Sequence, residues 1–318
     1  MSSSLSPSER SYIITGLIHP TSPTRLDGRS LLSPRPISIS YGDAPQANGS
    51  ARVILGGGTE VVAGIRLEVT DVDPSSGRSG REGWRGRVEV DVTPQAFPSM
   101  SSQMLSTLSS QYASLIADHF MPSLPPLPIL PPTKYFVPHL HLSLLSTTSA
   151  SIPAALLIAS RAAFSDLRIP KIKRIGYEAV STAQAEGGDK DLSGIKAAVR
   201  GSKGRGKTKG VMRGGEDWDL DLEKGDGTVY LEGRESLPVL VTLSMIPESQ
   251  VVFLDASVQE EAACPDRIHM FFTGSGRVCG LRLEGGEGLE DSRIRPLLTE
   301  GKRIAAELVT SLNAQLPR

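Results

Sequence analysis

Alternation of apolar and polar residues dominates the first 95 positions of this 318-residue chain. The segment from Val88 to Val92 alternates strictly, which is the period of a half-buried strand. We predict strands at four places in this region, near residues 36–40, 51–56, 60–70 and 85–93. The run Gly56-Gly-Gly58 falls between two of them and predicts a tight hairpin turn that needs positive φ.

Helical patterns precede and follow these strands. Ser6-Pro-Ser-Glu9 has the spacing of a capping box with proline at the first helical position, so it predicts a short amphipathic helix. The apolar side of that helix should carry Tyr12, Ile13 and Leu17. From residue 99 to 121 apolar residues recur at steps of three and four, which predicts a longer helix with one buried face.

A proline-rich segment leads into the rest of the chain. Six prolines between Pro122 and Pro132 predict a turn-rich or polyproline loop, because proline cannot continue a helix or a central strand. A strand near 134–145 and a helix near 152–166, with Ser151 as its N-cap, should follow. Later strands and a closing helix are predicted at 171–178, 238–246, 250–256, 267–273, 277–283 and 290–314, with a hairpin turn at Gly274-Ser-Gly276.

These elements predict a mixed α/β (α+β) fold built from two similar halves. Residues 1–35 would form an N-terminal helix and extended arm, 36–170 the first half and 171–318 the second. The segment 183–236 interrupts the second half, because it is rich in Gly and charged residues and poor in apolar ones. We predict a mobile loop there, either simply solvated or in contact with RNA or a partner.

Composition narrows the class of protein. Only 5% of residues are aromatic, so the core must be built from Leu, Ile, Val and Ala. A net charge of -1 argues against a polybasic nucleic-acid binder but leaves room for local basic patches. The polar N-terminus, the two cysteines and the absence of any apolar run near the ~18 residues of a membrane span favour an intracellular, reducing location without a membrane partner.

Two motifs carry candidate chemistry that we do not favour. Gly201-Ser-Lys-Gly-Arg-Gly-Lys-Thr208 fits the letters of a P-loop, but it lacks the preceding buried strand and the following helix that such a phosphate site needs. A glycine-rich basic loop is the preferred interpretation. His139 and His141 share one face of a strand, yet no further ligand lies nearby in sequence to complete a zinc site. We therefore predict no cofactor and no metal.

Four stretches resemble the RNase PH family of phosphorolytic RNA-degrading enzymes. They are Thr24–Arg29 (Thr-Arg-Leu-Asp-Gly-Arg), Gly49–Leu55, Val61–Val69 and Val251–Ala263. Within the family the chain is most similar to the ring subunits of the eukaryotic RNA exosome. The resemblance implies a hexameric ring of RNase PH-like subunits, OB-fold and KH cap subunits above it, a hydrolytic exoribonuclease below, and RNA, including precursor ribosomal RNA, in the channel. It also implies the nucleus, with the nucleolus, and the cytoplasm as locations.

The same resemblance implies that catalytic residues are missing. Active members carry aspartates six and twelve residues after the position of Asp255, where this chain has Glu261 and Arg267. Asp266 could restore the alignment through a local deletion, but that would shift the phase of the following strand. Active members also bind RNA and phosphate through arginines near the first long helix, whereas no Lys or Arg occurs from Val88 to Thr133.

A third deficit concerns the glycine-rich phosphate loop. At its place this chain reads Ser146-Thr-Thr-Ser-Ala-Ser151, which includes Thr148 and Ser149. We therefore predict a non-catalytic scaffold, with an active phosphate-dependent 3′–5′ exoribonuclease as the alternative. Asp27 and Arg29 should form a salt-bridged or turn-stabilising pair rather than a catalytic one.

RNA contact is predicted for the connection 71–87. It carries four arginines and one tryptophan that could bind phosphate and stack on a base: Arg78, Arg81, Trp84, Arg85 and Arg87. A solvated connection between two strands is the alternative interpretation.

Overall fold

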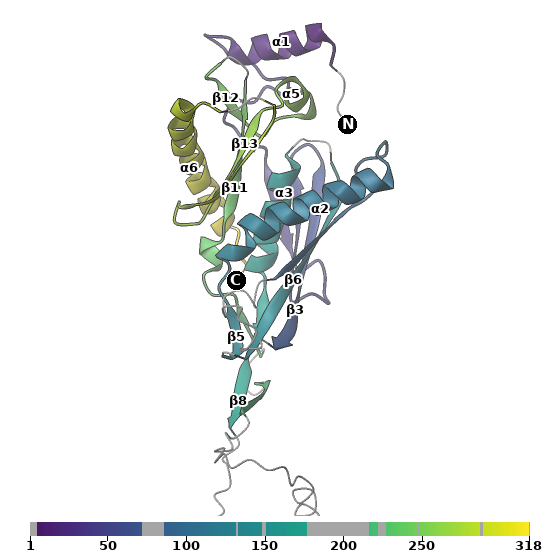
Figure 1. Cartoon of the computed structure of the whole chain (residues 1–318), viewed down its shortest axis with the longest axis vertical. Coiled ribbons are helices and arrows are strands. Elements are labelled where there is room, and N and C mark those ends of the chain that lie inside the picture. The colour runs from purple at the N-terminus through teal and green to yellow at the C-terminus, as the bar shows by residue number, and fades with distance from the viewer. Residues whose placement is uncertain are drawn as a thin grey trace, which may run out of the picture. The chain divides into compact units, whose positions relative to one another are not determined.

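The computed structural model describes residues 5–71, 86–131, 133–147, 151–176, 216–221, 227–246, 249–286 and 289–317 (Figure 1). The chain divides into two compact units. The larger comprises Met1–Pro170 with Thr228–Arg318, and the smaller comprises Lys171–Gly227. The P-loop-like segment 201–208 and most of the predicted RNA-facing connection lie outside the described residues.

The first sheet of the large unit has strand order β1-β2-β3-β6-β4, with β5 also paired to β6. Its strands are β1 (Ile37–Tyr41), β2 (Gly49–Leu55), β3 (Thr59–Asp71), β4 (Arg87–Val92), β5 (Leu127–Leu130) and β6 (Lys134–Ser146). β4 runs parallel to β6, and the other pairs are antiparallel. The glycine turn between β2 and β3 is confirmed, since Gly57 and Gly58 both have positive φ.

Two helices pack on this sheet. α2 (Ser102–His119) lies against β4, and α3 (Ile152–Ser165) lies against β2 and β3 (Figure 1). α3 also contacts β11 of the second sheet, which explains why it is buried on every side and apolar nearly throughout. Ser151 is its N-cap residue, as predicted, but the Ser151 side chain makes no capping hydrogen bond.

The second sheet has order β12-β11-β13-β14 and is antiparallel throughout. Its strands are β11 (Val239–Met245), β12 (Val252–Leu254), β13 (Arg267–Phe272) and β14 (Val278–Glu284). The long C-terminal α6 (Asp291–Asn313) packs on β11 and β13. The predicted hairpin at Gly274–Gly276 joins β13 to β14. Short elements complete this unit: η1 (Met121–Ser123), η3 (Arg234–Ser236), and the pair β7 (Arg168–Pro170) with β10 (Thr228–Tyr230).

The N-terminal helix α1 (Pro7–Ile18) begins with the predicted capping box, in which Ser6 and Glu9 each bond the other's backbone N–H. Ile13 and Leu17 are buried against α5 (Val258–Ala263) and its neighbourhood, as expected. The prediction for Tyr12 was wrong, because its side chain is 74% exposed.

Two loop predictions need correction. The proline-rich segment contains the short strand β5, which tolerates Pro128 because it pairs on one side only, with β6. The segment 183–236 contains β9 (Glu216–Leu220), which forms a hairpin with β8 (Ile172–Gly176) in the small unit, and also β10 and η3. The acidic composition of residues 216–223 suggested a loop, although Trp218 and Leu220 alternate with aspartates in β9. Of the predicted insert, residues 183–215 lie outside the described part of the structure.

Among the described residues, no helix combines the length and the apolar character that a bilayer span requires.

Candidate functional site

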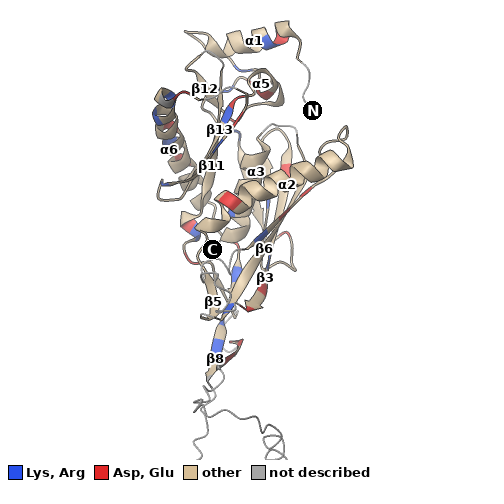
Figure 2. Ribbon diagram, in the orientation of Figure 1, with Lys and Arg blue, Asp and Glu red and all other residues tan. Residues whose placement is uncertain are grey.

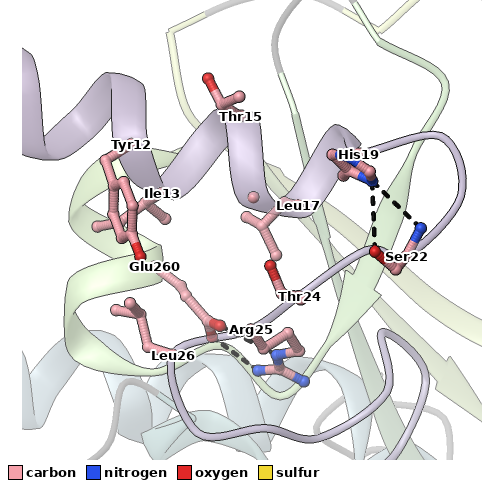
Figure 3. A pocket seen from close by; sticks show the side chains of 11 residues that line it. Tyr12, Ile13, Thr15, Leu17, His19, Ser22, Thr24, Arg25, Leu26 and Glu260 are labelled. Carbon is pink, nitrogen blue, oxygen red and sulfur yellow. Dashed lines mark hydrogen bonds and ion pairs between the residues drawn. The ribbon is translucent and has the colours of Figure 1, made fainter.

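The two stretches that carry the family resemblance lie in direct contact. Arg25 donates from Nε and Nη2 to the two carboxylate oxygens of Glu260, at 3.0 and 2.7 Å, and from Nη1 to the carbonyl oxygen of Leu254 at 2.9 Å. Both side chains of this bidentate pair are fully buried. Figure 3 shows it below α1, with Arg25 on the arm and Glu260 on α5.

Glu260 is positioned by a second capping box. The Ser257 hydroxyl accepts from the Glu260 N–H, and the Glu260 carboxylate accepts from the Ser257 N–H at 2.8 Å. Burial opposes ionisation, yet the bonds from Arg25 and Ser257 outweigh it and lower the pKa of Glu260. The spacing Ser257-x-x-Glu260 could have revealed α5 from sequence, but nothing in sequence connects Glu260 with Arg25.

Asp255 is held by two further arginines of the arm. Its Oδ2 lies 3.1 Å from Arg29 Nη1 and accepts from the Arg35 N–H at 3.0 Å. Arg29 also donates to Asp27 Oδ2 at 2.7 Å, which confirms the predicted salt-bridged pair. Asp255 has φ of 55°, a left-handed conformation that turns its carbonyl oxygen toward Arg25 and Arg29, each 2.9 Å away.

These contacts form a clasp, by which we mean Arg25, Arg29 and Arg35 of the arm together with Asp255 and Glu260. It joins residues more than 200 positions apart in the sequence. Asp255 Oδ1 is buried and has no hydrogen-bond partner among the described residues. Its other oxygen is already shared by two guanidinium groups, so the arrangement is suited to fixing the arm.

The other two predicted degenerate positions meet each other. Glu261 and Arg267 form an ion pair. Arg267 Nε also donates to Glu284 Oε2 at 2.8 Å, and His269 Nε2 lies 3.3 Å from that same oxygen. The contact with His269, together with Arg267 and against the effect of burial, lowers the pKa of Glu284 to about 2. Tyr112 of α2 lies in the same electrostatic environment, and burial raises its pKa to about 12.

Asp266 is directed elsewhere. Its Oδ1 accepts a hydrogen bond from the Gly286 N–H at 3.0 Å, and a Cβ at Gly285 would clash with that oxygen. Asp266 directly precedes β13, whose first residue is Arg267. The Asp266 carboxylate is therefore engaged by the backbone of Gly286, and the argument against it as a substitute aspartate stays a prediction.

The remaining predicted positions are only partly described. α2 carries no Lys or Arg, and its ribbon has no blue segment in Figure 2. Arg87 is exposed at the first position of β4. Outside the described residues lie Thr148, Ser149, Arg78, Arg81, Trp84 and Arg85, so their predicted roles stay predictions.

Two hollows border the clasp. One, of about 560 Å³, lies beside Asp255 and Arg35 and is lined mainly by apolar residues of α3, β11 and α6. The other, of about 500 Å³, lies between α1 and the arm above Arg25 (Figure 3). Since Arg35 and Arg25 are each engaged by a carboxylate, neither hollow offers a free cation to an incoming phosphate from the clasp. Within the described ranges, no group of three His, Cys, Asp or Glu could hold a metal ion.

Comparison with known proteins gives a consistent result. Residues 33–170 match the model of the RNase PH family, described as "3' exoribonuclease family, domain 1". The "Exosome complex component rrp42" of Schizosaccharomyces pombe is 25% identical over 93% of this chain and 87% of its own length. The "Exosome complex component Rrp42" of Methanothermobacter thermautotrophicus is 25% identical over 86% of this chain and 83% of its own length.

Solved structures agree on the fold. One described as "Archaeal exosome core" matches with a TM-score of 0.60 and 17% identity over 96% of both chains. Rice Rrp46 matches with a TM-score of 0.52 and 14% identity, over 92% of this chain and 100% of that one. The chain therefore has the RNase PH fold, and its residues 33–170 match the model of the RNase PH family.

Proposed function

We propose that this RNase PH-fold chain is a non-catalytic subunit of the ring of an RNA exosome. It would contribute to assembly and to the wall of the channel through which RNA passes for 3′–5′ processing and degradation, ribosomal RNA maturation included. Its neighbours would be other RNase PH-like subunits, with OB-fold and KH cap subunits and a hydrolytic exoribonuclease attached to the ring. We place the complex in the nucleus, including the nucleolus, and in the cytoplasm.

The ion pair between Glu261 and Arg267 carries this proposal. A phosphorolytic site needs a carboxylate that can act as an acid or bind a metal beside the scissile phosphate. Here the carboxylate at the first of the two positions, Glu261, is neutralised by the guanidinium of Arg267, which occupies the second. Arg267 is also held by Glu284, so it is not free to move away.

Assembly is supported by the free edge of the second sheet. β14 is an edge strand, and Val278, Leu281 and Leu283 on it are exposed. Soluble proteins usually protect such edges with charge or cover them, so an apolar edge is typical of a surface that a neighbouring chain covers. We assign that neighbour to another RNase PH-like subunit.

The purified chain should release no nucleoside diphosphate from single-stranded RNA in the presence of inorganic phosphate and Mg²⁺. The measurement is chromatographic, with an active RNase PH as positive control. Phosphate-dependent release that disappears in the Asp255→Ala or Glu261→Ala variant would contradict the proposal, because activity would then come from this chain and not from a contaminant.

Coexpression with the RNase PH-like subunits of its own cell should yield a stable mixed complex, since obligate interfaces commonly exceed ~2,000 Å² and are apolar. The double variant Leu281→Lys, Leu283→Lys should remain folded but enter the complex poorly. Val229→Lys, at an exposed apolar position on β10, is the matched control. A soluble monomer with no affinity for any such subunit would overturn the assembly role.

A further inference from the structure

A row of three basic side chains crosses the first sheet. In the β3–β6 register Arg66 lies opposite His139, and in the β4–β6 register Arg87 lies opposite the same His139. Directly paired residues on neighbouring strands project from the same face. The next row, Ile65, Leu140 and Val88, packs into the core under α2 and α3. Arg66, His139 and Arg87, here called the cationic row, therefore lie on the face away from those helices.

The two arginines of the row are available to a ligand. Both are exposed, and neither forms an ion pair with any residue that the structure describes. His139 Nε2 lies 3.2 Å from Glu68 Oε2. Strands are spaced about 4.8 Å apart, so the backbones that carry Arg66 and Arg87 are separated by about 10 Å, which the two long side chains can close around an anion.

Arg52 provides a contrast on the same face of the same sheet. It lies opposite Val62 on β3, in phase with Arg66, and it is engaged by Asp43 Oδ2 at 2.6 Å and Glu60 Oε1 at 2.7 Å. Arg52, which is half-buried, is thus engaged by two carboxylates. The cationic row has one such carboxylate, Glu68, against two guanidinium groups and an imidazole.

Neighbouring acidic residues indicate the direction that a polyanion would take. Glu89 and Asp91 follow Arg87 along β4 and lie opposite His141 and Ser143. A phosphate chain running along β4 would meet these two carboxylates. A chain crossing from β4 to β3 would pass Arg87, His139 and Arg66 in succession, with Glu68 already occupied by His139.

The position of the row also follows from a glycine. A Cβ at Gly86 would clash with the Pro138 carbonyl oxygen, so only glycine allows β4 to begin this close to β6. That approach places Arg87 beside His139. In sequence Arg87 directly follows the connection that carries Arg78, Arg81 and Arg85.

We propose that the cationic row binds the phosphate backbone of single-stranded RNA, which crosses the open face of the first sheet from β4 to β3. This inference rests on the proposed function and adds Arg66 to it as a phosphate-binding residue, with His139 as the residue that engages Glu68. The arginines supply charge and bidentate donors, and His139 between them engages the neighbouring carboxylate, Glu68. Contacts with phosphate carry no sequence information, so binding through the row should not select a particular RNA sequence.

The test uses the ring assembled with its own neighbours and a fluorescent unstructured RNA. In the Arg66→Ala, Arg87→Ala ring, the slope of log K against log salt should fall by about 1.4, since each phosphate contact to a single strand contributes about 0.7. The same relation makes RNA binding about 25-fold weaker at 0.1 M salt. The Arg52→Ala ring is the matched control and should keep the wild-type slope. The charge-conserving Arg66→Lys, Arg87→Lys ring should recover most of that slope.

Failure of this inference is distinguishable from failure of the proposed function. If the wild-type ring does not assemble or does not bind RNA, the proposed function falls. If the wild-type ring binds RNA and the Arg66→Ala, Arg87→Ala ring shows an unchanged slope, only the cationic row is overturned. Loss of assembly in the double variant would assign the row to a neighbouring acidic chain and would also overturn it.

Discussion

Replacement of Arg25 by alanine should lower the free energy of unfolding by about 3–5 kcal/mol, the usual cost of breaking a buried ion pair. The reason is the environment of Glu260, whose side chain is fully buried and whose two oxygens both accept from Arg25. Removing the guanidinium leaves a carboxylate that must be either uncompensated or protonated. The Leu254 and Asp255 carbonyl oxygens lose donors as well.

The measurement is pulse proteolysis in urea. A C-terminal label on this chain lets its unfolding be followed when partner subunits are present. Arg303→Ala is the control, because Arg303 pairs with Glu300 and Glu307 on the exposed side of α6, where ion pairs contribute little to stability. An Arg25→Met, Glu260→Met double variant should be less destabilised than the sum of the single variants, since it leaves no buried charge. A loss below about 1 kcal/mol for Arg25→Ala would show that the clasp is not a structural requirement.

The clasp explains why the resemblance is carried by framework residues. Arg25 and Arg29 lie in the first resembling stretch, and Asp255 and Glu260 in the last. Their contacts attach the N-terminal arm to the strand β12 and the helix α5. These hydrogen bonds and ion pairs hold the arm in place whether or not the clasp takes part in a reaction. A chain can therefore retain both stretches as structure while Glu261 and Arg267 neutralise each other.

Periodicity predicted most of the fold because each period follows from local geometry. The alternation from Val88 to Val92 and the three-to-four spacing from 99 to 121 became β4 and α2, within a few residues of the predicted bounds. The errors have local causes as well. β5 contains Pro128, which an edge strand accepts, and in β9 aspartates alternate with the apolar residues.

The site was less accessible to sequence reasoning, because its geometry depends on long-range contacts. Arg267 was predicted to oppose catalysis from its charge alone, which stays a prediction, and its ion pair with Glu261 was not anticipated. Its second partner, Glu284, lies across the β13–β14 hairpin and was not anticipated. The cationic row likewise requires the registers of three strands, which hydrophobic patterns do not provide.

Acidification should remove the stabilisation that Glu284 provides. The pKa of Glu284 is about 2 in the folded chain against an ordinary value of 4.5, so its contribution is complete above pH 4.5 and is lost as the pH falls from 4.5 to 2. Because Glu284 is partly exposed, solvent screening reduces this contribution to less than about 3 kcal/mol. We expect Glu284→Gln to destabilise the chain at pH 6, where Arg267 and His269 lose a charged partner, and to do so much less at pH 2.5.

The measurement is the urea midpoint of the wild type and the variant across that range, with Glu307→Gln as the control because its side chain is 68% exposed. The difference between wild type and Glu284→Gln isolates this group from Glu260, whose pKa is also lowered. A difference that stays constant from pH 6 to pH 2.5 would mean that the network around Arg267 does not depend on the charge of Glu284.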